Sequence, residues 1–396
     1  MFRRKYLSDV ELERLAIYKY TASQTPLLCD NVMRKFYNWF INYIPLWVAP
    51  NLLTFTGFFL NVANFCLTAY YDFDLDATSH PIDEYPIPRW VFLVVTINFF
   101  LAYTIDNIDG AQARRTGSAS PLGEVIDHSL DVYSANFIMG YIFSLFGRKG
   151  FSVMWMHLVT FTIYLSFYLP FFAQYHTNVL AFPQSYHIVM FGCTLAPLAA
   201  FVFGPQIYIR DTSIPKIPVP TYKKIIYTSS IFANYPVVAW NIYKSYRDKT
   251  GHMRSFHEAL KPLYTFFGFF IVATAWGYYS PNRILELNPR IFFLVTGTIF
   301  TNFCTRLIVA QMTKSAVNGW NHQLTLYTVA VIVCVAPYQM IGLPMLPMFV
   351  EKFMLLGLFV FSQSVHIHYA CGMINELCDY LGIRCFTIEP KSKQDN

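Results

Sequence analysis

The chain has 396 residues, of which 55% are hydrophobic and only 13% are charged. A soluble domain usually has about 25% charged residues, so this composition excludes an ordinary soluble domain and predicts an all-α, polytopic membrane protein. The net charge of +6 is modest, and no basic run is interleaved with aromatic residues. Nucleic acid is therefore not an expected partner.

Residues 1–50 are expected to form an N-terminal segment outside the membrane core. Ser8 and Glu11 have the spacing of a capping box, in which each side chain binds the other's backbone N–H, so a short helix should follow and end near Tyr18. Residues 28–44 place large apolar side chains on one helical face. This pattern is typical of an amphipathic helix in the lipid headgroup layer, although a helix packed against the rest of the protein would show it too.

Ten later stretches are long enough to span a bilayer, which requires about 20 apolar residues. We expect spans at Asn51–Tyr71, Trp90–Asp109, Asp127–Phe146, Phe151–Phe172, Ser185–Phe203, Tyr222–Tyr243, His257–Tyr279, Ile291–Met312, Leu324–Gly342 and Met348–Tyr369. They would form a transmembrane domain over residues 51–372, followed by a tail over residues 373–396. Lys and Arg are more frequent on the side of the two termini, so the positive-inside rule predicts that both termini are cytoplasmic.

Acidic residues are concentrated where the second expected span ends and the third begins. Asp106 and Asp109 are three residues apart, and Asp127 and Asp131 are four apart. Both spacings keep a pair on one side of a helix. Because the connection between the two spans is short, we expect the four carboxylates to meet at one membrane boundary. Charged residues in a bilayer are costly and are usually functional.

Four carboxylates cannot all remain ionised there without a cation. An oxygen-only ligand set suits Mg²⁺, Mn²⁺ or Ca²⁺, of which we expect Mg²⁺ or Mn²⁺, and this number of charges fits two adjacent ions. Gly110 and Ala113 would let a ligand approach the helix surface, and Gly123 would let the two helices approach each other or bend. Arg114 offers a bidentate donor for phosphate. The pattern therefore predicts a site that binds a polyphosphate together with divalent metal.

The order of these residues resembles a family signature. Asp-x-x-Asp-Gly-x-x-Ala-Arg at 106–114, then eight residues, then Gly-x-x-x-Asp-x-x-x-Asp at 123–131 is similar to the signature of the CDP-alcohol phosphatidyltransferase family. Further segments resemble its eukaryotic choline/ethanolamine phosphotransferase branch, namely residues 49–54, 284–290 and 366–369. The resemblance covers nearly the whole chain.

Two positions depart from the pattern of that branch. Ala111 stands where Lys is frequent, and Ser129 stands where Gly is frequent. Both lie close to the expected site but outside the signature itself. They bear on substrate preference more than on activity.

The resemblance implies a reaction and a setting. CDP-ethanolamine or CDP-choline would react with diacylglycerol, giving phosphatidylethanolamine or phosphatidylcholine and CMP. The later segments favour ethanolamine as the head group. The resemblance also implies ten helices with a cytoplasmic active site, often in a homodimer, in the membrane of the endoplasmic reticulum or the Golgi.

The resemblance also implies roles for single residues. The metal ligands would be the four aspartates of the signature, Asp106, Asp109, Asp127 and Asp131. Arg114 would bind the phosphates of the CDP group, and Asn51 would lie near the nucleotide. Gly110, Ala113 and Gly123 would belong to the same substrate-binding surface.

A further group must accept the proton of the attacking hydroxyl. His128 is adjacent to Asp127 and would not bind metal, and the usual His pKa of about 6.5 suits a base near neutral pH. Asp131 is the alternative, although a carboxylate bound to cations is a poor base. Glu124 lies near the aspartates, and it could be a fifth acid or a substrate contact.

Two other functions would also use acids inside a membrane. Intramembrane prenyltransferases bind diphosphate with Asp-rich motifs and Mg²⁺, but these motifs lack the Gly-x-x-Ala-Arg spacing found here. A cation transporter would use the four Asp as an ion pathway, and transporters often have paired halves with broken helices. Here the acids gather in one place without a matching second half. Measuring ion flux against CMP release would separate these classes.

Overall fold

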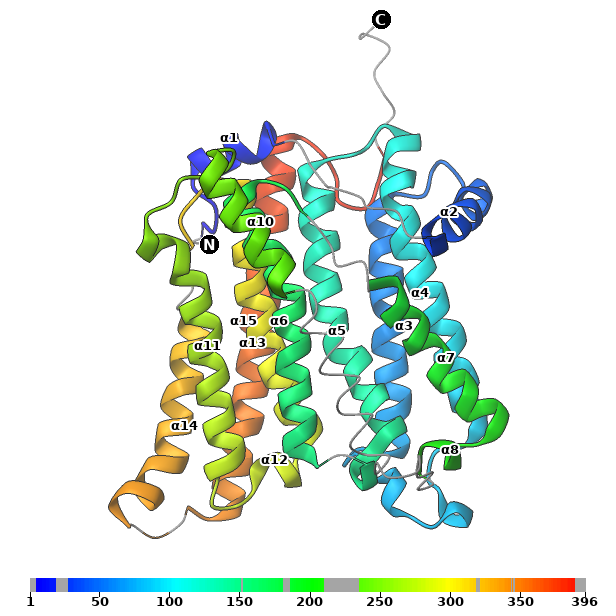
Figure 1. Cartoon of the computed structure of the whole chain (residues 1–396), viewed down its shortest axis with the longest axis vertical. Helices are drawn as coiled ribbons and strands as arrows, with labels where there is room; N and C mark the ends of the chain where they lie inside the picture. The colour runs from blue at the N-terminus through cyan, green and yellow to red at the C-terminus, as the bar shows by residue number, and fades with distance from the viewer. Residues whose placement is uncertain are drawn as a thin grey trace, which may run out of the picture.

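The computed structural model describes residues 5–18, 28–150, 152–180, 186–209, 235–317, 321–342, 344 and 346–388, and nearly all regular structure in these residues is helical. Long helices lie side by side along one axis (Figure 1). Seven helices are long and apolar enough to cross a membrane: α3 (Pro50–Tyr71), α4 (Arg89–Thr116), α6 (Val153–Thr177), α11 (Phe256–Tyr279), α13 (Pro289–Met312), α14 (His322–Ile341) and α15 (Met348–Leu381). The prediction of an all-α, polytopic membrane protein is therefore confirmed.

The other three expected spans differ from these seven. Helix α5 (Pro121–Gly150) runs along the bundle beside α3, but it includes the acidic residues of the signature. Helix α7 (Tyr186–Phe203) belongs to the shorter apolar helices. Most of the sixth expected span, Tyr222–Tyr243, lies outside the described residues, and its end falls in α10 (Tyr235–Asp248). The number of ten spans stays a prediction.

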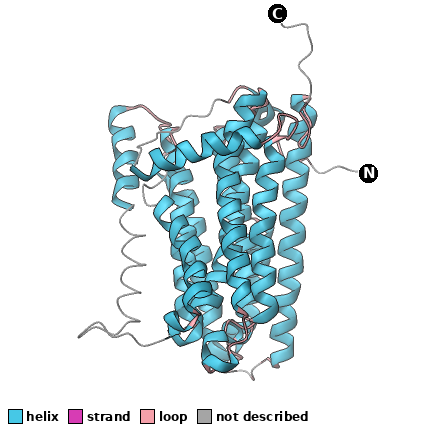
Figure 2. Cartoon of the chain, turned by 90° about the vertical axis from the view of Figure 1, so that its right-hand side faces the viewer, coloured by secondary structure: helices cyan, strands magenta, loops and turns pink. Residues whose placement is uncertain are grey.

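The N-terminal segment forms two helices. Helix α1 (Asp9–Ala16) begins with the expected capping box, because Ser8 Oγ accepts from the Glu11 N–H at 3.3 Å and the Glu11 carboxylate accepts from the Ser8 N–H at 2.9 Å. Helix α2 (Leu28–Phe40) lies across the bundle near one end (Figures 1 and 2). Its place in a membrane interface stays a prediction.

Several helices extend beyond the apolar stretches that defined the expected spans. Helix α4 continues past Asp109 to Thr116, where Gly117 takes a positive φ of 65° and ends it, and α5 already begins at Pro121. Helix α15 continues past Tyr369 to Leu381 in the same way. Hydropathy marks the apolar layer, whereas a helix ends where a residue leaves the helical conformation. The expected span ends at Asp109 and Tyr369 were therefore too early for the helices.

The helices form two groups that meet at α5. One group contains α3, α4 and α7, and the other contains α6, α11, α13, α14 and α15 (Figure 1). Helix α13 is the most buried candidate span, with 83% of its apolar window inside the protein. It packs against α5, α6 and α15, where Phe300 stacks on Tyr164 of α6 at 4.3 Å between ring centroids. Because α5 contacts both groups, its residues lie where they meet.

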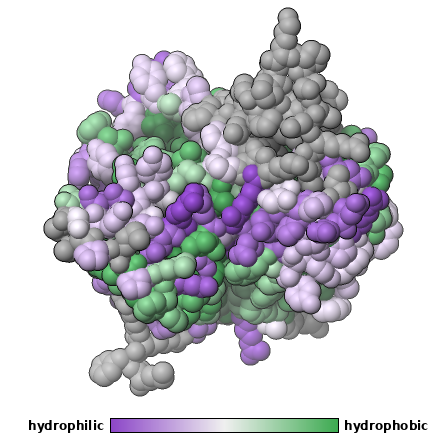
Figure 3. Space-filling model, turned by 90° about the horizontal axis from the view of Figure 1, so that it is seen from below, coloured by the Kyte–Doolittle hydropathy of each residue, from purple (hydrophilic) through white to green (hydrophobic). Residues whose placement is uncertain are grey.

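The two ends of the bundle differ. Helix α1 and the end of α15 lie at one end, where the Tyr6 and Leu7 N–H groups donate to the Glu376 carboxylate. The opposite end has short helices in its connections, η2 (Ala77–Ser79), η3 (Ile82–Glu84), α8 (Gln206–Ile209) and α12 (Ile284–Leu287). Hydrophilic residues gather across the middle of that end (Figure 3). We refer to these as the α1 end and the α12 end.

Candidate metal and phosphate site

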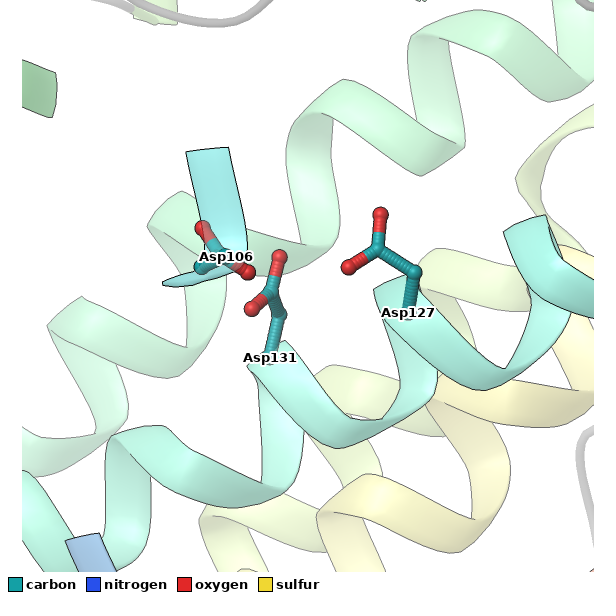
Figure 4. Close-up of side chains that lie close together, drawn as sticks. All are labelled: Asp106, Asp127 and Asp131. Carbon is teal, nitrogen blue, oxygen red and sulfur yellow. The ribbon is translucent and has the colours of Figure 1, made fainter. Parts of the chain in front are cut away.

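Three carboxylates converge near the α1 end of the bundle. Asp106 extends from α4, and Asp127 and Asp131 extend from α5 toward it (Figure 4). One oxygen of each lies within 4.8 Å of the others. That separation is about twice a metal–oxygen distance of about 2.1–2.4 Å, so one or two divalent cations could contact all three. Asp127 Oδ1 is buried and accepts no hydrogen bond from any residue that the structure describes, so the donor set fits a divalent cation.

Asp109 lies beside this group rather than in it. Its Oδ2 accepts a hydrogen bond from Thr54 Oγ1 of α3 at 2.5 Å, and the residue is only 7% exposed. Its charge still acts on both Asp106 and Asp127. A spacing of three residues turns Asp109 about 60° away from Asp106 around the helix axis, at about 100° per residue. The structure thus brings three of the four expected ligands together, with the fourth held by a Thr.

The start of α3 lies against the first turn of α5. A Cβ on Gly123 would lie 3.3 Å from Asn51 Oδ1, so a side chain at this position would press on Asn51. Asn51 Nδ2 donates to the carbonyl of Cys385 at 2.9 Å, and Phe386 packs on Phe55 with ring centroids 5.1 Å apart. A segment after α15 therefore lies over Asn51. Sequence reasoning missed this contact because its partners are 334 residues apart and share no motif.

The two Arg residues of α4 differ in their surroundings. Arg114 is exposed, and its charge acts on Asp109. Gly110 is exposed, and a Cβ added to it would meet only Arg114 Nη1, at 3.6 Å. The helix surface is therefore open at Gly110. Ala113 nearby is half-buried. Arg115 instead donates to the Ile41 carbonyl in η1 (Ile41–Tyr43). Arg114 is thus available to a ligand, whereas Arg115 holds the segment after α2.

His128 lies between α5 and α6. Its side chain is only 6% exposed, and its ring lies 5.4 Å from that of Phe171, measured between centroids. Helices α5 and α6 run in opposite directions (Figure 1), so a later residue of α6 lies beside an earlier residue of α5. Phe171 lies beside His128, and Phe167 lines the same cavity as Asp131. His128 therefore lies one turn of α5 toward the α1 end from Asp131.

A cavity adjoins the carboxylates on the side of the membrane interior. The cavity is partly open to the outside. Asp106 and Asp131 form one part of its wall. The rest comes from α3, α4, α5, α6 and α7, and most of these residues are apolar: Thr54, Gly57, Phe58, Asn61, Phe99, Ala102, Tyr103, Leu130, Ser134, Ile138, Phe167 and Met190. The chemistry of this lining suits a ligand with one polar end and an apolar body.

Known proteins are similar to this chain over the region that contains the site and over the rest of the chain. Residues 47–215, which include α3 to α7, match the family model described as CDP-alcohol phosphatidyltransferase. The chain is 34% identical to human ethanolaminephosphotransferase 1 over 387 residues, which cover 97% of this chain and 95% of that protein. It is 29% identical to choline/ethanolaminephosphotransferase 1 of Arabidopsis thaliana over 408 residues, covering 98% and 99%. The similarity therefore extends through the second group of helices.

Proposed function

The chain belongs to the CDP-alcohol phosphatidyltransferase family, and we propose that it transfers phosphoethanolamine from CDP-ethanolamine to diacylglycerol, giving phosphatidylethanolamine and CMP. The observation that supports this most is the position of three Asp carboxylates at one end of a largely apolar cavity inside a membrane protein. CDP-choline, alone or beside CDP-ethanolamine, is the alternative donor, since similar plant and yeast proteins are named for both head groups.

The metal ligands in this proposal are Asp106, Asp127 and Asp131, with Asp109 beside them. The ions would be Mg²⁺ or Mn²⁺, and two of them would fit the four negative charges. When bound, such ions neutralise charge on the CDP phosphates and favour in-line attack. Arg114 would add a bidentate contact to a phosphate from the aqueous side.

The nucleotide would bind at the α1 end. Asn51 is fixed there by the Cys385 carbonyl, and its Oδ1 faces Gly123. Gly110 and Ala113 leave the neighbouring surface of α4 open for the diphosphate. These groups would hold the donor in one orientation, and orientation alone can contribute several kcal/mol to a transfer reaction.

Diacylglycerol would occupy the cavity on the other side of the carboxylates. Its free hydroxyl would point toward Asp106 and Asp131, and its acyl chains would lie along Phe58, Phe99 and Phe167. The acceptor would enter from the bilayer while the donor enters from water. A lipid photo-crosslinker should label cavity residues; labelling of aqueous loops alone would contradict this path.

In the transfer step, the acceptor hydroxyl oxygen forms a bond to the phosphorus that bears ethanolamine. The bond from that phosphorus to the oxygen of the CMP phosphate breaks, and CMP leaves with this electron pair. The hydroxyl proton passes to a ring nitrogen of His128, which lies between the cavity and the donor side along α5. Asp131 is the alternative acceptor of this proton.

We also propose that both termini and the site face the cytoplasm in the endoplasmic reticulum or Golgi membrane, with a homodimer as the assembly. The orientation is supported by the distribution of charge. The connection Asp72–Arg89, at the α12 end, holds five acidic residues and one Arg. The positive-inside rule disfavours the cytoplasm for a loop so poor in basic residues.

The reaction can be tested with purified protein, diacylglycerol and Mg²⁺ or Mn²⁺. CDP-ethanolamine and CDP-choline are supplied in separate tubes, and CMP and labelled phospholipid are measured together. We expect metal-dependent phosphatidylethanolamine, absent in Asp131→Ala. No product from either donor would contradict the proposal, and radiotracer cation flux would then test the transporter alternative.

His128→Ala tests the proton acceptor. We expect it to retain metal-dependent CDP binding but to lose about 10²–10⁴-fold in turnover, since general bases contribute about that much. The control His257→Ala changes an exposed His at the start of α11. Normal turnover in His128→Ala would exclude His128 as the base.

A further inference from the structure

Two polar side chains in the cavity beside the carboxylates are not used by the proposed reaction. Asn61 of α3 and Ser134 of α5 both line this cavity, together with Asp106 and Asp131. Asn61 is 6% exposed and Ser134 is 8% exposed, and most of the remaining wall is apolar. Polar groups in such surroundings are costly unless each has a hydrogen-bond partner. The partners of these two side chains therefore indicate what the cavity binds.

The side chain of Asn61 has an unused hydrogen-bond acceptor. Its Nδ2 donates to the Gly57 carbonyl at 3.4 Å, so the side chain folds back by one turn of α3, toward the α1 end and the carboxylates. Its Oδ1 is buried and accepts no hydrogen bond from any residue that the structure describes. A buried amide oxygen of this kind favours a ligand group that donates a hydrogen bond.

Ser134 has an unused hydroxyl in the wall of the same cavity. Across the described part of the chain, no residue forms a hydrogen bond with its Oγ. Ser134 follows Asp131 by three residues, which is a rise of about 4.5 Å along α5 toward the α12 end. A Ser hydroxyl has one O–H to donate, so Ser134 favours a ligand group that accepts a hydrogen bond, such as a carbonyl.

The two polar side chains lie at a similar depth in the bundle. The ring of Phe58 on α3 lies 5.6 Å from that of Tyr133 on α5, and the ring of Phe65 lies 5.5 Å from that of Phe137, measured between centroids. The polar residue of each helix lies between the two aromatic residues of that helix. The cavity therefore offers one acceptor and one donor at about the same level, just deeper than Asp131.

We infer that Asn61 and Ser134 bind the polar part of the lipid acceptor. Asn61 Oδ1 accepts a hydrogen bond from its free hydroxyl, and the Ser134 hydroxyl donates to the carbonyl of the adjacent ester, at sn-2. This inference rests on the proposed function. Diacylglycerol has one donor, its hydroxyl, and its ester carbonyls only accept, so each group matches one of the two side chains.

The spacing within the lipid agrees with this assignment. Five bonds separate the hydroxyl oxygen from the sn-2 carbonyl oxygen, and six separate it from the sn-1 carbonyl oxygen, so the sn-2 ester is the nearer one. Asn61 holds the hydroxyl before transfer. Rotation about the C–O bond of the lipid then turns the same O–H toward the proton acceptor proposed above.

The consequence is a selectivity for the sn-2 linkage. An ether at sn-2 has no carbonyl, so the Ser134 hydroxyl would remain unpaired in the cavity. A site built on hydrogen bonds discriminates against analogues that lack them. An ether at sn-1 would leave both proposed hydrogen bonds intact.

The test compares wild type, Ser134→Ala and Asn61→Leu with three acceptors of equal chain length. These are 1,2-diacylglycerol, 1-O-alkyl-2-acylglycerol and 1-acyl-2-O-alkylglycerol, each supplied in detergent micelles with CDP-ethanolamine and Mg²⁺. KM and kcat are measured for each acceptor, and KM for the donor is measured in parallel. Ser364→Ala, which changes an exposed Ser on α15, is the matched control.

In wild type, we expect kcat/KM for both 2-acyl lipids to exceed that for the 2-O-alkyl lipid by about 3- to 10-fold, the effect typical of one neutral hydrogen bond. Ser134→Ala should bring this ratio to about 1 by lowering only the values for the 2-acyl lipids. Asn61→Leu should lower kcat/KM for all three lipids by about 10-fold, with the donor KM changed by less than about 3-fold. Ser364→Ala should behave as wild type.

Different results would contradict different claims. An active wild type that uses the sn-2 ester and the sn-2 ether equally well would overturn the inference, even if neither variant folds, and would mean that the two side chains bind only water. An unchanged ratio in Ser134→Ala, or an Asn61→Leu that alters only the donor KM, would also overturn it and leave the proposed function intact. A wild type that releases no CMP with any acceptor would overturn the proposed function and, with it, this inference.

Discussion

Buried carboxylates at the two ends of the bundle have opposite surroundings. At the α12 end, Glu351 is fully buried, and its two oxygens accept from Trp276 Nε1 at 2.8 Å, Ser280 Oγ at 2.7 Å and Asn282 Nδ2 at 2.8 Å. Near the α1 end, Asp106, Asp127 and Asp131 face one another instead. A carboxylate that the protein itself satisfies holds helices together, whereas one that faces other carboxylates requires a ligand.

Asp72, also at the α12 end, has partners supplied by the protein, as Glu351 does, and so differs from the carboxylates near the α1 end. Its Oδ1 accepts from the backbone N–H groups of Asp76 at 2.8 Å and Ala77 at 3.0 Å. Its Oδ2 faces the buried Arg290 guanidinium at 3.9 Å. Burial raises the pKa of Asp72, and the attraction of Arg290 opposes that rise. Asp72 thus has backbone donors and a cation supplied by the chain, as expected of a structural contact.

The largest effect should come from Asp127→Asn at the α1 end. It removes one oxygen of a proposed metal ligand and one charge at a nearly constant size. We expect activity to fall about a thousand-fold, since electrostatic stabilisation of the transition state is lost. The fold should persist, and without metal the variant should melt no lower than wild type because repulsion among carboxylates is reduced.

The metal dependence of melting sharpens this test. Mg²⁺ or Mn²⁺ binding to the folded state should raise the melting temperature of wild type. The increase should be smaller in Asp127→Asn. An equal increase in both proteins would mean that the ions act elsewhere.

The next effect concerns stability at the α12 end. Arg290 donates from Nε and Nη2 to the Asp72 carbonyl at 2.9 and 2.6 Å, and from Nη1 to the Gly140 carbonyl at 3.2 Å. Arg290→Met removes these bonds and leaves the Asp72 carboxylate without its cation. Breaking a buried pair on one side costs about 3–5 kcal/mol of stability. We expect a clearly lower melting temperature in detergent.

Arg283→Met is the control for this change. Arg283 forms an exposed pair with Glu286 at 3.1 Å, and exposed pairs contribute about 0–1 kcal/mol. If Arg290→Met melted no lower than Arg283→Met, the buried contact at Asp72 would not be structural. The fraction of Arg290→Met that remains folded should retain metal-stimulated activity, because the carboxylates near the α1 end are unchanged.

The sequence predicted what depends on local spacing. The distances between Asp106, Asp127 and Asp131 along the chain placed them on facing sides of two adjacent helices, and the capping box at Ser8 placed the start of α1. Because hydropathy follows the apolar layer, the spans were recognised but the extension of α4 to Thr116 was not. Helical spacing, the capping box and hydropathy are all read from residues close together in the sequence, and they account for both the correct predictions and the missed end of α4.

Contacts between distant segments could not be predicted in this way. The hydrogen bond from Tyr18 to Glu124 joins residues 106 apart, and that from Asn51 to Cys385 joins residues 334 apart. Neither pair shares a repeating pattern, because each depends on how whole helices are arranged. Thr54 left only a faint signal, namely a polar residue near the start of an apolar span.

The smallest expected effect concerns Thr54. Its partner Asp109 shares features with both kinds of carboxylate, those that the protein satisfies and those that face other carboxylates. The Thr54 hydroxyl donates to Asp109, so the protein satisfies one oxygen of a residue that borders the proposed metal ligands. Thr54→Val keeps the shape and removes the donor. Loss of a partner that orients a metal ligand typically costs 10–100-fold in metal affinity or activity. We expect the Mg²⁺ concentration for half-maximal activity to rise about 10-fold, with a smaller change in maximal rate.

Thr56→Val is the matched control, because Thr56 is exposed on the same helix and its hydroxyl donates only to the Leu52 carbonyl at 2.7 Å. Equal metal requirements in the two variants would mean that Asp109 does not act on the ions. A 10-fold difference would show that Asp109, although outside the group of three, belongs to the ligand-dependent carboxylates and not to those that the fold satisfies.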